Sequence, residues 1–285
     1  MKRIFNKFLI ITQMVVICMI LQGCNEKNEE NNQYLNKIWV LDLGEGYSTD
    51  ISLYITEIDS ENISGKISFD GSLAELPYYS DSTRTWPKPQ GDFEGTFVNG
   101  AAKCTFSNSE GDQGELLLTF KEDEVILANI EFEQKSESMR KWHDRSNGEY
   151  RFRAYNVKDL INSAFLNYQI KEKICCGDDW GFGKDVYLVI GKVTDIETGR
   201  YYPDTMIIDR EGNILYRIHP GYLSGSEVAD VTIEDINQDG LQDISVTTRF
   251  TIEEEGKDYY IKWDSYQMKM GGFYLNERIE SVQEF

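Results

Sequence analysis

The segment from Asp235 to Asp243 has the residue types and spacing of a loop that binds a hard cation. It reads D-x-N-x-D-G-x-x-D, with Asp235, Asn237 and Asp239 at alternate positions and Asp243 at its end. A cation such as Ca²⁺ takes about six to eight oxygen ligands, and side chains at alternate positions of a tightly wound loop converge on one point. We expect the backbone carbonyl of Leu241 to supply a further oxygen, so the segment predicts a calcium site.

The residues that flank this loop favour a connection between two β-strands. An EF-hand would need a glutamate at the position of Val246 and a helix after the loop, whereas Ile244–Thr248 alternates like a strand. The loop instead resembles the calcium loops of FG-GAP and VCBS repeats, with Val231–Ile233 entering it and Gly240 at the sharp turn. The resemblance covers about residues 225–250 and implies Ca²⁺ binding. Three carboxylates without a bidentate glutamate suggest a Kd on the order of 10⁻⁴ to 10⁻³ M.

Because the chain contains a single copy of the motif, the propeller of those families is not implied. The alternative interpretation of the segment is a surface hairpin whose acidic residues are only solvated. We expect a bound cation to have a structural role, since it would pin a hairpin in place.

A second residue with distinctive chemistry is Cys24. Positive charges at Lys2–Lys7 precede an apolar run, Phe8–Leu21, which is too short for a stable spanning helix. The run ends in Leu21–Cys24, which resembles the bacterial lipobox, and this implies cleavage after residue 23 and lipidation of Cys24. The alternative is an ordinary cleaved signal. As a whole the chain resembles VCBS-repeat-containing lipoproteins of Gram-positive bacteria, which implies a lipid anchor on the extracytoplasmic face of the cell membrane.

Three further cysteines, Cys104, Cys175 and Cys176, remain in the mature chain and cannot all pair with one another. A bridge from Cys104 to one of the vicinal pair, a strained ring between the vicinal residues, and free thiols are all open. A redox switch is the least favoured interpretation, because the vicinal pair lacks the C-x-x-C spacing.

The elements that must position these residues are mostly β-strands. After a flexible polar tether over 24–33, residues 34–147 contain short alternating runs separated by turns, of which Asn99–Gly100 is the strongest hairpin signal. We predict an antiparallel β-barrel or meander that resembles a lipocalin in architecture alone, with Gly65 and Gly95 at sharp corners. The expected strands are 37–43, 51–55, 63–69, 93–98, 101–106, 116–120 and 125–132.

Residues 70–92 form an unusually long connection within this unit. The segment contains Tyr78, Tyr79 and Trp86 together with three prolines. Exposed aromatic rings at these positions would provide a stacking platform for a carbohydrate or a peptide. The alternative, which we favour, is that they cap the open end of the barrel.

A strongly polar segment, 133–147, marks the expected boundary before a second β-rich unit over 148–285, which carries the predicted calcium loop. Asn156 is placed to cap a short helix over 157–161. The sequence thus predicts an all-β protein with minor α content. The expected strands of the second unit are 150–155, 185–190, 205–208, 214–218, 228–233, 244–250, 259–268 and 272–275.

Composition narrows the classes of function. The 285 residues include 49 acidic and 29 basic ones, a net charge of −20 that disfavours nucleic acid as a partner. The two histidines and the absence of known nucleophile or phosphate-binding motifs favour a protein without catalysis. Acidic pairs such as Asp178–Asp179 leave an envelope hydrolase as a minor alternative. We expect a non-catalytic, calcium-binding, lipid-anchored surface protein that binds or scaffolds at the cell envelope, with a glycan or peptide as its ligand.

Overall fold

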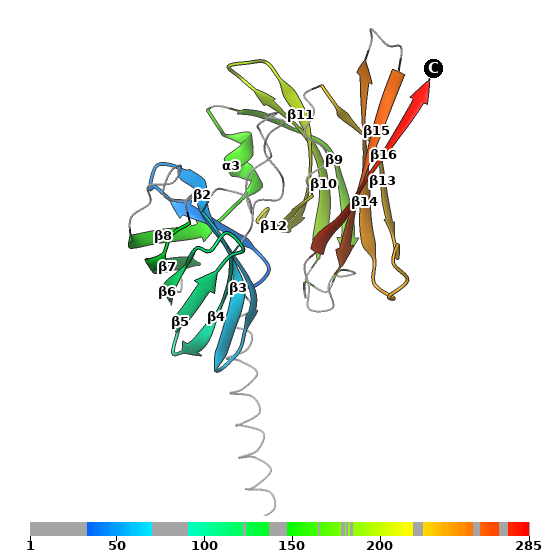
Figure 1. The fold of residues 1–285 in the computed structure, drawn as a ribbon. Coiled ribbons are helices and arrows are strands. Elements are labelled where there is room, and N and C mark those ends of the chain that lie inside the picture. The colour runs from blue at the N-terminus through cyan, green and yellow to red at the C-terminus, as the bar shows by residue number, and fades with distance from the viewer. Residues whose placement is uncertain are drawn as a thin grey trace, which may run out of the picture.

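The computed structural model describes most of the chain from residue 33 onward. The described residues are 33–69, 91–121, 124–136, 147–164, 166–177, 180, 182, 185–218, 225–252, 257–267 and 273–284. Strands dominate them and form a closed barrel and two four-stranded antiparallel sheets (Figure 1). The predicted all-β class with minor α content is therefore confirmed.

The first part is a closed antiparallel barrel of eight strands in which each strand pairs with its neighbours in sequence and β8 pairs with β1. The predicted barrel is confirmed, but its boundary lies later than expected. The strand expected at 150–155 in the second unit is β8, so the polar segment that suggested a boundary connects two neighbouring strands of one sheet. The strands are β1 (Ile38–Asp42), β2 (Tyr47–Ile58), β3 (Asn62–Ser68), β4 (Gly91–Val98), β5 (Ala101–Ser107), β6 (Gln113–Lys121), β7 (Val125–Gln134) and β8 (Gly148–Ala154).

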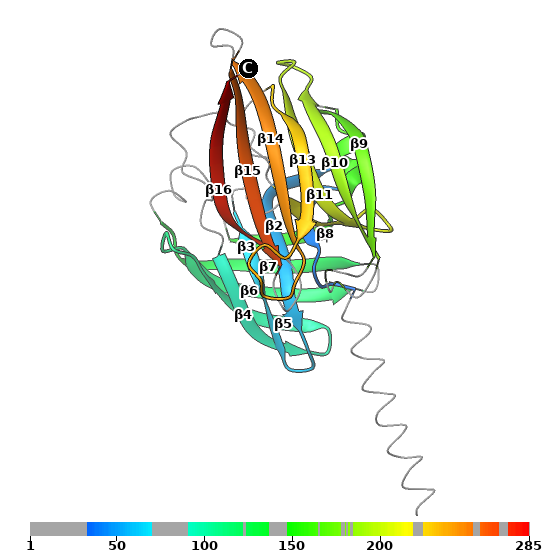
Figure 2. The same ribbon diagram turned by 90° about the vertical axis from the view of Figure 1, so that its right-hand side faces the viewer.

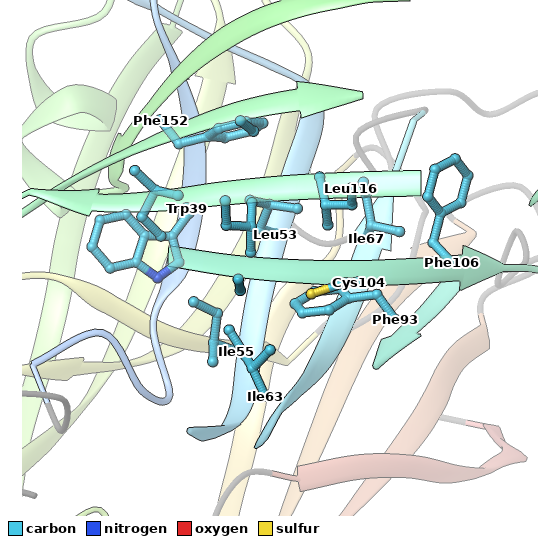
Figure 3. Close-up of a cluster of buried hydrophobic side chains, with 14 of the residues drawn as sticks. Trp39, Leu53, Ile55, Ile63, Ile67, Phe93, Cys104, Phe106, Leu116 and Phe152 are labelled. Atoms are coloured by element: carbon cyan, nitrogen blue, oxygen red, sulfur yellow. The ribbon is translucent and has the colours of Figure 1, made fainter. Parts of the chain in front are cut away.

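The interior of the barrel is filled by side chains from every strand. Alternate residues point inward, as the period of a β-strand requires, and the outward positions between them are mostly polar, with Leu117 and Leu127 among the exceptions. Trp39 lies fully buried at one end, where its indole Nε1 donates to Tyr34 O at 3.1 Å. An eight-stranded barrel is just wide enough for such a core. Figure 3 shows the packed side chains of Trp39, Leu53, Ile55, Ile63, Ile67, Phe93, Cys104, Phe106, Leu116 and Phe152.

Two turn and corner predictions for the barrel are borne out by backbone geometry. Asn99 and Gly100 both have positive φ, 53° and 75°, which is the conformation of a tight type I′ hairpin. A Cβ atom added at Gly95 would lie 2.1 Å from Lys103 O, and one at Gly65 would lie 2.3 Å from Tyr54 O. These glycines therefore allow neighbouring strands to approach where the sheet curves strongly.

The second part contains two antiparallel sheets, with strand orders β12-β11-β10-β9 and β13-β14-β15-β16. Strand β9 was not expected from the sequence. It is an edge strand in which Gln169–Lys173 are all exposed, so apolar alternation is nearly absent. The strands are β9 (Leu166–Gly177), β10 (Val186–Asp195), β11 (Tyr201–Asp209), β12 (Ile214–Ile218), β13 (Glu227–Glu234), β14 (Asp243–Ile252), β15 (Lys257–Gln267) and β16 (Phe273–Glu284).

The β9–β12 sheet is the central layer of the molecule. In Figure 1 it lies between the barrel and the β13–β16 sheet. Figure 2 shows the same two open sheets in a view rotated by 90°. One face packs on the outside of the barrel, where Val189 and Met206 meet Ile38 and Val40 of β1. The other face shares a core with β13 and β14. The residues of that core include Trp180, Leu188, Ile207, Leu215, Ile218, Ile244 and Val246.

The barrel and the central sheet are joined through a hydrogen-bonded connection. Tyr155 N donates to Ile38 O of β1, and Ile214 N of β12 donates to Tyr155 O, each at 2.8 Å. The predicted short helix follows as α3 (Val157–Ile161), with Asn156 as its N-cap and Asp159 completing a capping box. Asn156 Nδ2 also donates to Asn213 Oδ1 at 3.1 Å, which attaches the cap to the β11–β12 turn.

A buried ion pair lies on the barrel-facing side of the central sheet. Arg217 Nη2 donates to Asp204 Oδ2 at 2.8 Å, and the two side chains are 2% and 0% exposed. Burial raises the pKa of the nearby Tyr168 hydroxyl, and the charge of Asp204 raises it further. The pair thus places charge within an interface made mostly of aliphatic side chains and tyrosine rings.

Candidate functional site

The predicted calcium loop connects β13 to β14. Cross-strand pairs Glu234↔Asp243 and Ile233↔Ile244 close the hairpin at the base of the loop. The prediction that strands flank the loop on both sides is therefore correct. Ile244 and Val246 of β14 are fully buried between the two open sheets, so the loop is attached to a packed core.

The first half of the loop is wound around the carboxylate of Asp235. Its Oδ1 accepts from Asp239 N at 3.0 Å and its Oδ2 accepts from Gly240 N at 2.9 Å. Asn237 Oδ1 accepts from Asp239 N at 3.0 Å, and Asp239 Oδ1 accepts from Leu241 N at 2.9 Å. The side chains at alternate positions therefore accept hydrogen bonds from backbone amides of the loop, while Asn237 and Asp239 remain exposed to solvent.

Asp243 closes the loop from the other side. Its side chain is completely buried, and Oδ2 accepts from Ile236 N at 3.0 Å and from Asn237 N at 3.4 Å. Gly240 has a φ of +89°, which a residue with a side chain rarely adopts, as the sharp turn required. The structure thus places the side chains of Asp235, Asn237, Asp239 and Asp243 on one loop. Leu241, whose backbone carbonyl was the fifth predicted ligand, lies on the same loop between Gly240 and Asp243.

In this arrangement the carboxylate oxygens face backbone amides rather than a common central point. Among the residues that the structure describes, no group of three or more His, Cys, Asp or Glu side chains is placed to hold a metal ion. Each carboxylate oxygen has a second lone pair, so the same side chains can accept an amide hydrogen bond and also face a cation. Binding of a cation would require the side chains to rotate so that these lone pairs face one point.

Three of the other predicted sites lie outside the described residues. They are the signal segment with Cys24, the aromatic residues Tyr78, Tyr79 and Trp86, and the acidic pair Asp178–Asp179. Among the described residues, no helix is long and apolar enough to span a bilayer.

The three remaining cysteines are described and none is in a disulfide. Cys104 lies inside the barrel, whereas Cys175 and Cys176 are on β9 of the central sheet, so the bridge considered from the sequence is not formed. Successive residues of a strand point to opposite faces, which separates the thiols of the vicinal pair. Cys175 is exposed and Cys176 is half-buried.

We predict that a thiol reagent at neutral pH modifies Cys175 in the folded protein and leaves Cys104 unmodified. Burial raises the pKa of the Cys104 thiol to about 12, and the thiolate is the reactive form. The experiment uses the chain from Asn25 onward, here called the soluble chain, which omits the predicted signal segment and lipidation site. Mass spectrometry of its peptides measures the modification of both cysteines. Unfolding in denaturant provides the control in which both react. Labelling of Cys104 in the native protein at the rate of Cys175 would contradict a packed barrel.

Sequence patterns did not indicate one further feature, a polar groove on the outside of the barrel. It is lined by residues of β2 to β7, among them Ser64, Lys66, Glu94 and Thr105. No single segment carries a signal for it, because the groove exists only once six strands are aligned. The register that aligns them is set by the barrel.

Comparison of the chain with protein families, with curated proteins and with solved structures finds no significant match in any of the three.

Proposed function

We propose that this protein is a calcium-binding, lipid-anchored surface protein of the bacterial envelope, with a binding or scaffolding role and no catalytic one. The observation that carries the calcium proposal is the β13–β14 loop. It carries the oxygen-bearing side chains of Asp235, Asn237, Asp239 and Asp243, each of which accepts a hydrogen bond from a backbone amide of the loop, and the side chain of Asp243 is completely buried at its base.

The residues of the loop suit a hard cation. Asp235, Asn237, Asp239 and Asp243 offer side-chain oxygens, which Ca²⁺ prefers, and Leu241 offers its backbone carbonyl. Three carboxylates in one short loop also repel one another, and a divalent cation would relieve that repulsion. Because the loop joins two strands whose residues are packed in the core, the bound ion would stabilise the hairpin.

We predict that calcium raises the free energy of unfolding by about 1.4 to 2.7 kcal/mol at a concentration 10 to 100 times Kd. Chemical unfolding with calcium and with a chelator measures the difference, and Asp239→Ala should abolish it. Asp195→Ala is the matched control, since Asp195 accepts a hydrogen bond from Thr198 N in the β10–β11 turn, away from this loop. A calcium effect that survives in Asp239→Ala would contradict the assignment to this loop.

The lipid anchor is proposed from the lipobox-like segment and predicts that Cys24 is acylated. A palmitate analogue supplied to expressing cells should label the wild-type chain and leave Cys24→Ala unlabelled, because only the thiol can carry the thioether lipid. The wild-type protein should also partition with the membrane fraction. Equal labelling of the two chains would refute the anchor.

A binding role through the aromatic residues Tyr78, Tyr79 and Trp86 is the second candidate. Strands β3 and β4 flank the segment that carries them, and the outward side chains near those strand ends, Lys66 and Asp92, line the polar groove. A surface suited to a carbohydrate or peptide ligand thus lies near the ends of β3 and β4, the two strands between which the aromatic residues fall in the sequence.

A further inference from the structure

The polar groove on the barrel has a volume of about 630 Å³. It crosses β3, β4 and β5, which lie side by side in Figure 1, and extends to β6 and β7. A volume of this size lies within the range of roughly 300 to 1,000 Å³ that is usual for sites that bind small molecules. Its lining residues come from six neighbouring strands, so a ligand would contact several strands at once.

Two rows of outward side chains form the walls of the groove. Ser64, Glu94 and Thr105 are direct cross-strand neighbours on β3, β4 and β5. Lys66, Asp92 and Ser107 form the next row on the same strands. Cross-strand neighbours are close enough to contact one ligand group together, so each row offers hydroxyl and charged groups to the same sugar-sized unit.

The net negative charge of the groove favours a ligand that carries positively charged groups. Lys66 Nζ is paired with Asp92 Oδ1 at 3.1 Å, which leaves Glu94 and Glu133 as excess carboxylates in the lining. Beyond the groove, Glu115 and Glu131 are directly opposite each other on β6 and β7. Lys103 Nζ is paired with Glu115 Oε1 at 2.9 Å, so of these two residues it is Glu131 that adds to the negative potential beside the groove.

The shape of the groove favours a carbohydrate over a peptide. It lies on the face of a closed barrel, where no strand edge is available to pair with a peptide backbone. The side chains that would contact a ligand are hydroxyls, carboxylates, an amide and the ammonium group of Lys66, which is paired with Asp92. The apolar residues of the lining, Phe93 and Phe106, are buried beneath them. Hydroxyl and carboxylate groups in rows match the hydroxyl pairs of a sugar ring.

We propose that this groove binds a short, hydroxyl-rich oligosaccharide that carries free amino groups. The proposal deepens the binding role given above and names its ligand class, and it does not depend on the calcium loop. Carboxylates such as Glu94 and Glu133 accept charge-assisted hydrogen bonds from the ammonium groups, while Ser64, Thr105 and Ser107 contact the sugar hydroxyls.

The test is a calorimetric titration of the soluble chain with the trimer of glucosamine, below neutral pH so that its amines are protonated. The fully N-acetylated trimer and a lysine tripeptide are the comparison ligands. We expect the glucosamine trimer to bind to the wild-type protein. The double variant Glu94→Gln/Glu133→Gln should raise the Kd for the trimer by about tenfold or more. Glu172→Gln on β9, an exposed residue of the other sheet, is the matched control and should bind like the wild type.

A second variant, Thr105→Trp, places a large side chain in the groove and should abolish binding. Its Tm should stay close to that of the wild type, which shows that the barrel is still folded. Absence of binding by the glucosamine trimer would overturn the proposal, as would equal binding by the groove variants. Equal or tighter binding of the lysine tripeptide would overturn the ligand class. Asp239→Ala should bind the trimer normally, so failure of the calcium proposal is distinguishable from failure of this one.

Discussion

Replacement of Arg217 by methionine should lower the free energy of unfolding by about 3 to 5 kcal/mol, because it leaves the carboxylate of Asp204 buried without its partner. Burial alone would lower the pKa of Arg217, but the charge and hydrogen bond of Asp204, together with the nearby Tyr155 and Tyr168, outweigh that effect and the pKa is raised. The native protein therefore depends on both charges being present together. The pair lies between β11 and β12, on the face that packs against the barrel.

Denaturant unfolding of the variant measures the loss, and Asp204→Asn/Arg217→Met is the informative companion. A buried ion pair replaced as a unit costs far less than one that has lost a single partner, so the double variant should recover much of the stability. Arg249→Met removes an exposed arginine that is paired with Glu227 and should change stability much less. A loss in Arg217→Met no larger than that in Arg249→Met would show that the charges are not buried in solution.

The second large effect is expected at Gly95, where replacement by alanine should destabilise the barrel by about 3 kcal/mol, the upper end of the usual range for overpacking. The new Cβ would lie 2.1 Å from Lys103 O and 2.6 Å from Cys104 Cα. Both atoms belong to the backbone of the paired strand β5, so no side-chain rotation relieves the collision. The sheet itself would have to move apart.

Gly46→Ala is the matched control for this substitution. A Cβ atom at Gly46 meets nothing within 4 Å, so we expect a change within about 0.5 kcal/mol. Thermal or denaturant unfolding of the two variants gives the comparison directly. A Gly95→Ala protein as stable as Gly46→Ala would mean that β4 and β5 are not as close as the barrel requires.

The parts of the fold that could be predicted from the sequence are those with strong local signals. Strands such as β5 alternate because one face of each is buried in the barrel, and Asn99–Gly100 specifies its own turn. The cap at Asn156 could be predicted for the same reason, since a capping residue acts on its own helix. The residues on either side of the calcium-type loop likewise indicated the two strands that it joins.

The parts that could not be predicted depend on partners distant in sequence. Strand β8 closes the barrel by pairing with β1, which no local pattern indicates. Strand β9 has one exposed edge and alternating charges, so its pairing with β10 decides its conformation. The ion pair of Asp204 and Arg217 and the rows of the groove arise from cross-strand register, which is fixed only when the sheets form.

The central claim is that the loop from Asp235 to Asp243 binds calcium, and calorimetric titration of the soluble chain with Ca²⁺ tests it most directly. We expect saturable binding of one ion with a Kd on the order of 10⁻⁴ to 10⁻³ M, and loss of that binding in Asp239→Ala with retention in Asp195→Ala. Absence of heat and of any shift in Tm at millimolar calcium, or unchanged binding in Asp239→Ala, would contradict the account.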